Sequence, residues 1–471
     1  MRKIYTLILT VATCFAAMTA TAQTPGYNRL QNATTGHVVN LASSSSFAPN
    51  VTMEEAYSLA GTVAYLDFDG NRVASLKAQN VDVVNVVIPM MKVLVPQILD
   101  EETFLALRDS TAEMVRENMG GAMGTLLTGY LKRYTYDDFL DYVDGLDTNM
   151  YFQEADGGYY LYLYSPPFPI DAGDFNSYFT SKINGYLRYY VGTMQDMAAE
   201  YLVGREELQP MVNSMISHFR FGDYFYLAEE NDEEFGAQFA FTNSLDHKTS
   251  GVNEVWNFLP VDNDENYFGL RGQYQDAEGK WYASFAADFP VKLSDGMTAY
   301  CVTNVVDGGK SLIQRKKIEG DIIPALTPMI VQLNGENAAD NKLRVIDGEY
   351  TNVVEGNALQ LATDSLGFLL GKRLPAPDKR YYVLGIMEGK VSLVETEETF
   401  LVPNEAILYL DSNVKDRNLT GYLILSDNVD GIEEHVATNS NTGKYYDLQG
   451  RQVEKPVRGV YIVNGKKVVV K

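Results

Sequence analysis

The chain has 471 residues, of which 46% are hydrophobic and 12% aromatic, so it can form two or three packed domains. Its 38 basic and 62 acidic residues give a net charge of −24, which repels phosphate backbones and anionic membranes and argues against nucleic-acid binding. Cys14 and Cys301 are its only cysteines, which excludes a disulfide scaffold and a zinc–cysteine site.

Residues 1–22 have the layout of a secretory signal peptide. A basic start at Arg2 and Lys3 precedes an apolar run, and residues 20–22 read Ala-Thr-Ala. This order predicts export, with cleavage between Ala22 and Gln23. Residues 11–14 half resemble a lipobox ending at Cys14, which leaves lipid attachment as an alternative. After residue 22 no stretch has the roughly 18–20 apolar residues of a membrane helix, so we expect no transmembrane segment in the mature chain.

Residues 23–80 are predicted to form β hairpins. Strand-like residues 27–32 and 37–41 flank a Thr-Thr-Gly turn, and residues 64–68 and 72–76 flank Asp69-Gly70.

Residues 81–220 are predicted to be mainly helical. Asp100 provides a helix start and Gly120 a helix end, while Thr135 can cap a short acidic helix. Two strands interrupt the helices, near residues 149–153 and 159–164.

Residues 221–426 show short strand patterns with a turn about every ten residues, which predicts a β-rich domain. The fold class is therefore α+β: a β-rich body, trefoil-, barrel- or sandwich-like, with a largely helical segment inserted near its N-terminal side. Cys301 lies in one of these strand patterns and is expected to be buried as a small hydrophobe.

Residues 427–443 are polar and read as a linker, and residues 444–471 as a small β module. This module has the pattern Y-D-L-Q-G-R-x-V followed by G-x-Y-I-V-N-G-K-K-V. Asn-Gly is the turn that a two-residue hairpin demands. The residues that carry the pattern are Tyr446, Asp447, Gly450, Arg451, Gly459, Tyr461, Asn464 and Gly465.

The pattern resembles the C-terminal sorting tails of proteins exported by Bacteroidetes through type IX secretion. The resemblance implies an extracellular or outer-surface location and an interaction with outer-membrane secretion machinery. A hairpin module with no sorting role is the alternative.

Residues 27–36 resemble the opening of a ricin-type β-trefoil repeat, an aromatic strand with Asn and then Thr-Gly. Glu254-Val255-Trp256 is similar to the Gln-x-Trp signature of that family, with Glu in place of Gln. The resemblance implies carbohydrate binding but transfers no sugar-contacting residue.

No catalytic constellation emerges from the sequence. The four histidines lack the i, i+4 spacing of a metal-binding helix, and there is no Gly-x-Ser-x-Gly nucleophile motif. We therefore expect no metal site, no cofactor and no catalytic residue. The abundant carboxylates keep a polysaccharide or peptide hydrolase open as an alternative.

Four tyrosines are the candidate ligand-binding residues, because phenol rings stack on sugars and hydrogen-bond to hydroxyl groups. They lie between Gly157-Gly158 and a Ser-Pro-Pro turn, and they are Tyr159, Tyr160, Tyr162 and Tyr164. The sequence thus favours a non-catalytic secreted or surface binding protein for a glycan or host glycoprotein. The hydrolase and a structural surface protein are its alternatives.

Overall fold

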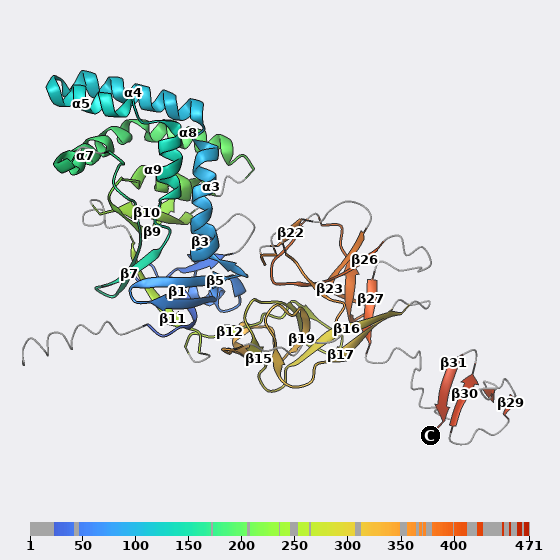
Figure 1. Ribbon diagram of the computed structural model, residues 1–471. Coiled ribbons are helices and arrows are strands. Elements are labelled where there is room, and N and C mark those ends of the chain that lie inside the picture. Colours follow the sequence, from blue (N-terminus) through green and yellow to red (C-terminus); the bar gives the residue numbers. More distant parts are fainter. Residues whose placement is uncertain are drawn as a thin grey trace, which may run out of the picture.

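The computed structural model describes most of the chain (Figure 1). The described residues are 23–41, 47–170, 173–204, 208–234, 236–244, 253–262, 265–306, 312–348, 356–363, 367–369, 371–373, 379–398, 400–411, 422–426, 445–446, 452–453, 459–463 and 466–470. The predicted signal peptide and the predicted linker 427–443 lie outside them.

Six antiparallel strands close into a ring, here called the barrel. They are β1 (Gly26–Asn32), β4 (Ala64–Asp69), β5 (Arg72–Ala78), β7 (Met150–Ala155), β8 (Gly158–Tyr164) and β11 (Val255–Pro260). Each strand pairs with the next, and β11 pairs with both β8 and β1. Closure removes the exposed edges of a sheet. Segments more than 200 residues apart in the sequence therefore form one body.

Further strands extend this sheet. They are β2 (Val38–Leu41), β3 (Phe47–Val51), β6 (Val81–Asp82), β9 (Tyr224–Asp232) and β10 (Gly236–Asn243). The pairs β2–β3 and β9–β10 are antiparallel. Trp256 on β11 is fully buried in the core beneath them. The short helix α2 (Met53–Ala56) connects β3 to the 3-10 turn before β4.

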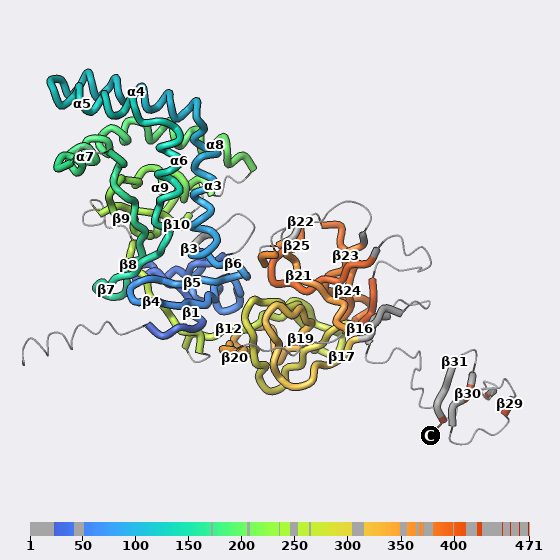
Figure 2. Tube along the Cα trace, viewed as in Figure 1, coloured from blue at the N-terminus to red at the C-terminus, as the bar shows by residue number. Residues whose placement is uncertain are grey.

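Two insertions in the barrel together make the helical lobe, which we define as helices α3 to α9. Helices α3 (Ile88–Ile98), α4 (Glu101–Met119), α5 (Gly121–Leu131) and α6 (Tyr136–Asp144) lie between β6 and β7. Helices α7 (Asn176–Leu187), α8 (Val191–Tyr201) and α9 (Gln209–His218) lie between β8 and β9. Figure 2 shows the lobe at one end of the barrel. The expected helical insertion is thereby confirmed.

The helix boundaries follow local sequence signals. Asp100 accepts a hydrogen bond from the Thr103 backbone N–H at 2.9 Å and starts α4, and Gly120 ends it at a positive φ. Thr135 and Asp138 form a capping box at the start of α6. Among the described residues no single helix is long and apolar enough to cross a membrane, although Val83–Ile98 and Glu101–Met119 pass that test together as a sharply bent pair.

The second β body lies between residues 261 and 426, and its described residues form three buried clusters. One small sheet contains β12 (Phe268–Gly269), β20 (Lys342–Val345), β15 (Val291–Lys292) and β18 (Ile322–Ile323). The larger sheet contains β13 (Tyr274–Gln275), β14 (Trp281–Phe285), β19 (Met329–Leu333), β16 (Thr298–Val306), β17 (Leu312–Lys317), β27 (Tyr422–Ser426), β24 (Lys390–Glu395), β23 (Lys379–Met387), β26 (Ala406–Asp411) and β21 (Gln360–Leu361). A separate pair is β22 (Lys372–Arg373) with β25 (Phe400–Leu401). Ala60 and Val63, just before β4, belong to the buried cluster that contains Phe268 and Phe289. They therefore pack this body against the barrel.

A small C-terminal sheet contains β28 (Tyr445–Tyr446), β29 (Gln452–Val453), β30 (Gly459–Val463) and β31 (Lys466–Val470). Strands β30 and β31 pair antiparallel, with Val463 opposite Lys466, as a two-residue Asn-Gly turn predicts. The chain as a whole is therefore the α+β, β-rich protein with an inserted helical segment that the sequence predicts.

Candidate functional site

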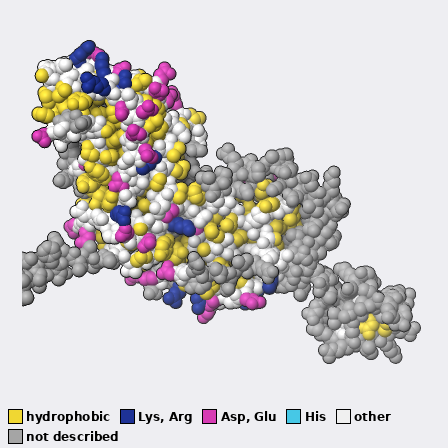
Figure 3. Space-filling view, viewed as in Figure 1, with side chains coloured by type: hydrophobic (Ala, Val, Ile, Leu, Met, Phe, Trp, Pro, Cys, Tyr) yellow, Lys and Arg dark blue, Asp and Glu magenta, His cyan; other side chains and the backbone are white. Residues whose placement is uncertain are grey.

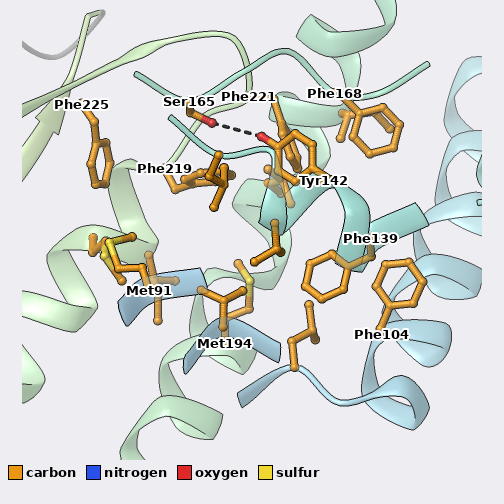
Figure 4. Close-up of a pocket in the computed structure, with 18 of the residues that line it drawn as sticks. Met91, Phe104, Phe139, Tyr142, Ser165, Phe168, Met194, Phe219, Phe221 and Phe225 are labelled. Atoms are coloured by element: carbon orange, nitrogen blue, oxygen red, sulfur yellow. Dashed lines mark hydrogen bonds between the residues drawn. The ribbon is translucent and has the colours of Figure 1, made fainter. Parts of the chain in front are cut away.

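The helical lobe contains a partly open apolar cavity of about 340 Å³ above the barrel. Its walls come from α3 to α9, from Leu163 and Tyr164 on β8, and from Phe225 on β9. Figure 4 shows aromatic side chains and the methionines Met91 and Met194 directed toward one shared space. A volume of this size falls at the lower end of the range of about 300–1,000 Å³ for small-molecule sites.

The shape of the cavity follows from helical periodicity. On α6, Phe139, Tyr142 and Val143 lie at spacings of three and four and face inward together. On α3, Ile88, Met91 and Val95 form the matching stripe. Because these stripes belong to separate helices that diverge from the barrel, their apolar faces leave space between them.

One hydrogen-bonded pair interrupts the apolar wall. The Tyr142 hydroxyl donates to the Pro166 carbonyl oxygen at 2.9 Å and lies 3.2 Å from Ser165 Oγ. Figure 4 draws the Tyr142–Ser165 bond at the edge of the cavity. Burial raises the pKa of Tyr142 well above its ordinary value, so the phenol is neutral at physiological pH. The Tyr142 hydroxyl donates its one proton to the Pro166 carbonyl oxygen. Ser165 Oγ therefore donates to the Tyr142 oxygen and still has an acceptor position available.

The two charged residues of the lining have protein partners. Arg108 binds the Asp109 carboxylate through Nε and Nη2 at 2.9 and 2.8 Å, and the Tyr134 carbonyl oxygen through Nη1 at 3.0 Å. Asp147 accepts from the Tyr151 hydroxyl at 2.7 Å and from a backbone N–H. Hydrogen bonding to the Asp147 carboxylate outweighs its desolvation and lowers its pKa. Arg108 is therefore paired with a carboxylate and Asp147 is hydrogen-bonded before any ligand enters.

The opposite face of β7, β8 and β9 carries a cluster that we call the tyrosine face. Its members are Tyr151, Tyr160, Tyr162, Tyr164, Tyr224 and Tyr226. The Tyr162 ring lies 5.6 Å from the rings of both Tyr151 and Tyr226. Tyr224 is exposed and the others are half-buried. Burial and neighbouring phenols raise the pKa of Tyr226 to about 12, so the face stays uncharged.

The structure places the four candidate tyrosines on two faces of β8. Tyr160, Tyr162 and Tyr164 belong to the tyrosine face, whereas Tyr159 points to the other side. Tyr164, at the end of β8, also borders the apolar cavity. Tyr159 stacks on Phe258 at 5.2 Å and receives a hydrogen bond from the Gln23 side chain. Alternation of side chains along a strand makes this division inevitable.

Part of the sorting pattern falls within the described residues. Tyr446 lies in β28 and Gly459 and Tyr461 in β30, where Tyr461 is buried against Tyr445. The remaining residues of the pattern, and Ala22 at the predicted cleavage site, are outside the described residues. They are Asp447, Gly450, Arg451, Asn464 and Gly465.

A second cavity, of about 320 Å³, lies between the barrel and the second β body. Glu405 is the acidic residue in its described lining, where burial and the nearby Glu398 raise its pKa. Asp288 is the other described acid whose pKa is raised, and it does not line this cavity. The described part of the chain thus brings no pair of perturbed acids into one cleft.

No group of three or more potential metal ligands of the His, Cys, Asp or Glu type occurs within the described ranges. Of the residues that line the apolar cavity, Tyr164 is the one that the sequence had singled out as a candidate. The apolar lining residues read as ordinary core positions, and only the apolar character of both faces of residues 83–99 hinted at more than one apolar surface.

Comparisons with protein families, with curated proteins and with solved structures found no match to this chain.

Proposed function

We propose that this chain is an exported, non-catalytic binding protein whose helical lobe holds a neutral, largely apolar molecule. The observation that carries the proposal is the cavity of about 340 Å³ walled by aliphatic and aromatic side chains from α3 to α9. Transfer of apolar surface from water into such a space is favourable, and no catalytic group is needed for it.

The polar points of the cavity argue for a ligand with a hydroxyl group. Ser165 lines the cavity and its Oγ keeps an acceptor position, which suits a hydroxyl donor. A carboxylate is less suitable, because Arg108 already binds Asp109 and a buried charge without a partner is costly. The ligand class is therefore a neutral long-chain alcohol or a similar hydroxyl-bearing lipid.

A displacement assay tests this proposal. The neutral dye N-phenyl-1-naphthylamine should fluoresce on binding the purified protein, and 1-dodecanol should displace it better than dodecanoate. Met194→Trp on α8 should fill the cavity and weaken dye binding about tenfold, which is about 1.4 kcal/mol. Met197→Trp, on the same helix but not in the cavity lining, is the matched control.

The role of Ser165 has its own readout. Ser165→Ala should weaken dodecanol binding by about three- to tenfold, the value of one hydrogen bond. Dodecyl methyl ether has no hydroxyl to donate and should bind both proteins equally. A protein that binds no dye, or whose dye binding survives Met194→Trp unchanged, would contradict the proposal.

The location rests on the two ends of the sequence. The signal-peptide layout of residues 1–22 and the sorting-tail pattern of residues 444–471 support export to the cell exterior. Expression in a Bacteroidetes host, with and without residues 444–471, tests this. Loss of the protein from the exterior on truncation supports the sorting role, and unchanged export removes it.

A second candidate function is glycan binding at the tyrosine face, which also fits the ricin-type resemblance. Six phenol rings lie side by side there, with Tyr224 exposed at 46%. A glycan array tests it with Tyr162→Ala and Tyr224→Ala, and with Tyr274→Ala in the second β body as the control. Glycan binding that persists in both face variants would exclude this surface.

A further inference from the structure

The outer face of α3 is an exposed apolar stripe. Met90 and Val93 lie on α3, and Val86 and Val87 lie in the π-helical turn Val83–Val87 that leads into it. All four are exposed and outside the cavity lining, and Val93 is 60% exposed. Exposed apolar residues scattered singly are ordinary, but a continuous stripe along one helix marks an interaction surface. Figure 3 shows hydrophobic side chains gathered over the helical lobe.

The neighbouring end of α8 enlarges this stripe. The Tyr201 hydroxyl donates to Gln97 Oε1 of α3 at 3.0 Å, which places the two helices side by side. Tyr201 is 43% exposed and Val203, just beyond it, 78% exposed. A tyrosine with an apolar ring and a polar tip suits the boundary between water and lipid. We call these six residues the α3 surface: Val86, Val87, Met90, Val93, Tyr201 and Val203.

The α3 surface and the apolar cavity are two sides of one wall. Ile88, Met91 and Val95 face the cavity, while Met90 and Val93 face outward. A soluble helix usually has one apolar face and one polar face, so a helix that is apolar on both faces has two apolar environments to meet. The cavity is one of these environments. The second must contact the exposed face of α3, directly across the helix from the cavity.

We propose that the α3 surface docks on an electrically neutral lipid surface, from which the cavity takes or to which it delivers its apolar ligand. This inference rests on the proposed function of the cavity. Lys92 is the single charged residue between residues 83 and 99, and its ammonium group binds the Asp144 carbonyl oxygen at 2.5 Å. The docking stripe itself is uncharged.

The charge of the protein also indicates what binds the α3 surface. The net charge of −24 repels an anionic bilayer and equally repels a second copy of the same chain. A neutral lipid surface has no such cost, because it gains contact with apolar side chains without bringing like charges together. The interaction would be in the plane of the interface, as for other helices that lie on membranes.

Vesicle flotation tests the docking. The full protein should float with phosphatidylcholine vesicles and should float less with vesicles that contain phosphatidylglycerol. Met90→Asp/Val93→Asp should reduce the floated fraction at least about tenfold, because both positions are exposed and the fold does not depend on them. Leu326→Asp/Val402→Asp changes two exposed apolar residues of the second β body and should float like the unchanged protein.

The milder variant Met90→Gln/Val93→Thr introduces no charge and so controls for a folding defect of the Asp variant. It should lose part of its binding to phosphatidylcholine vesicles. Equal flotation of the Met90→Asp/Val93→Asp variant and the unchanged protein would overturn the proposal, and so would stronger binding to phosphatidylglycerol. Light scattering that finds a dimer dissolved by the same variant would assign the surface to a second copy instead.

The dye assay without vesicles separates the two proposals. Met194→Trp should lose the dye but still float, since the α3 surface is intact. If the protein binds the dye but does not float, the proposed function of the cavity stands and the docking proposal is wrong. If the protein floats but binds no dye, the proposed function of the cavity is wrong, while the α3 surface still binds lipid.

Discussion

Gln79 and Asn404, 325 residues apart, are joined by two amide hydrogen bonds. Gln79 Nε2 donates to Asn404 Oδ1 at 2.7 Å, and Asn404 Nδ2 donates to Gln79 Oε1 at 2.8 Å. Gln79 follows β5 of the barrel, and Asn404 precedes β26 of the second β body. Both residues have positive φ angles, 54° and 65°, which the surrounding structure must hold in place. The two hydrogen bonds therefore link the barrel specifically to the second β body.

Removing one member of the pair should leave a buried amide without its partner. We expect Asn404→Ala to lower the free energy of unfolding by about 1–3 kcal/mol, measured by urea denaturation. Gln79→Ala should cost a similar amount, since Gln79 is 1% exposed. The double variant should cost less than the sum of the two. Gln153→Ala, exposed on β7, is the control, and additive losses would show that the amides act independently.

Asp288 makes the stability of the same junction depend on pH. Its Oδ2 accepts from the Asn80 backbone N–H at 2.9 Å, while Oδ1 has no hydrogen-bond partner among the described residues. Burial raises the pKa of Asp288 to about 6 from an ordinary value of 3.8. Between these two pH values the folded state binds more protons than the unfolded state, so stability falls as the pH rises from about 4 to about 6.

Asp288→Asn should remove this dependence. At pH 7.5 the variant should be more stable than the unchanged protein, by at most about 3 kcal/mol. At pH 4 the two should be alike, because the native carboxyl is then protonated. Urea denaturation at both pH values measures the difference. A variant that is less stable at pH 7.5 would mean that the carboxylate is stabilising there, contrary to its burial.

Local signals in the sequence predict the elements but not their assembly. Asp100, Gly120 and Thr135 mark helix ends in the sequence, and the structure has helix ends at those residues. The pairing of β1 with β11 joins residues more than 220 apart, and neither periodicity nor turn residues carry information at that range. The order of the strands in the ring is therefore known from the structure alone, although the sequence already predicted a β-rich body with the helices inserted.

The apolar cavity escaped prediction for a different reason. Phe139 and Met194 follow the same helical spacing that a filled core requires. Whether their side chains meet or leave a space depends on the angles between helices, which the spacing does not encode. The tyrosines of β8 were recognisable, because three of them alternate with Leu161 and Leu163 and so had to share one face.

Trp256 tests how β9 is attached to the barrel. It is fully buried, and its Nε1 donates to the Leu227 carbonyl oxygen at 3.0 Å, tying β11 to β9. Trp256→Phe should lower the free energy of unfolding by about 1–3 kcal/mol through the lost hydrogen bond and the smaller ring. Trp281→Phe is the matched control, because Trp281 is only partly buried, and it should lose less. Equal losses would contradict a special role of Trp256.

Cys301 offers a probe of the second β body. Its side chain is fully buried on β16, as expected for a small hydrophobe, and Sγ lies 3.5 Å from the Lys316 carbonyl oxygen. Burial raises the pKa of the thiol, which lowers the thiolate fraction that reacts. In protein lacking residues 1–22, Cys301 is the only cysteine, so labelling with 5,5′-dithiobis(2-nitrobenzoate) should be negligible without urea and complete once β16 unfolds. Cys301→Ala/Tyr274→Cys places the thiol on an exposed site and should react at once. Rapid labelling of native Cys301 would mean that this part of the second β body opens without global unfolding, since a thiol buried in its core is reached only when that core opens.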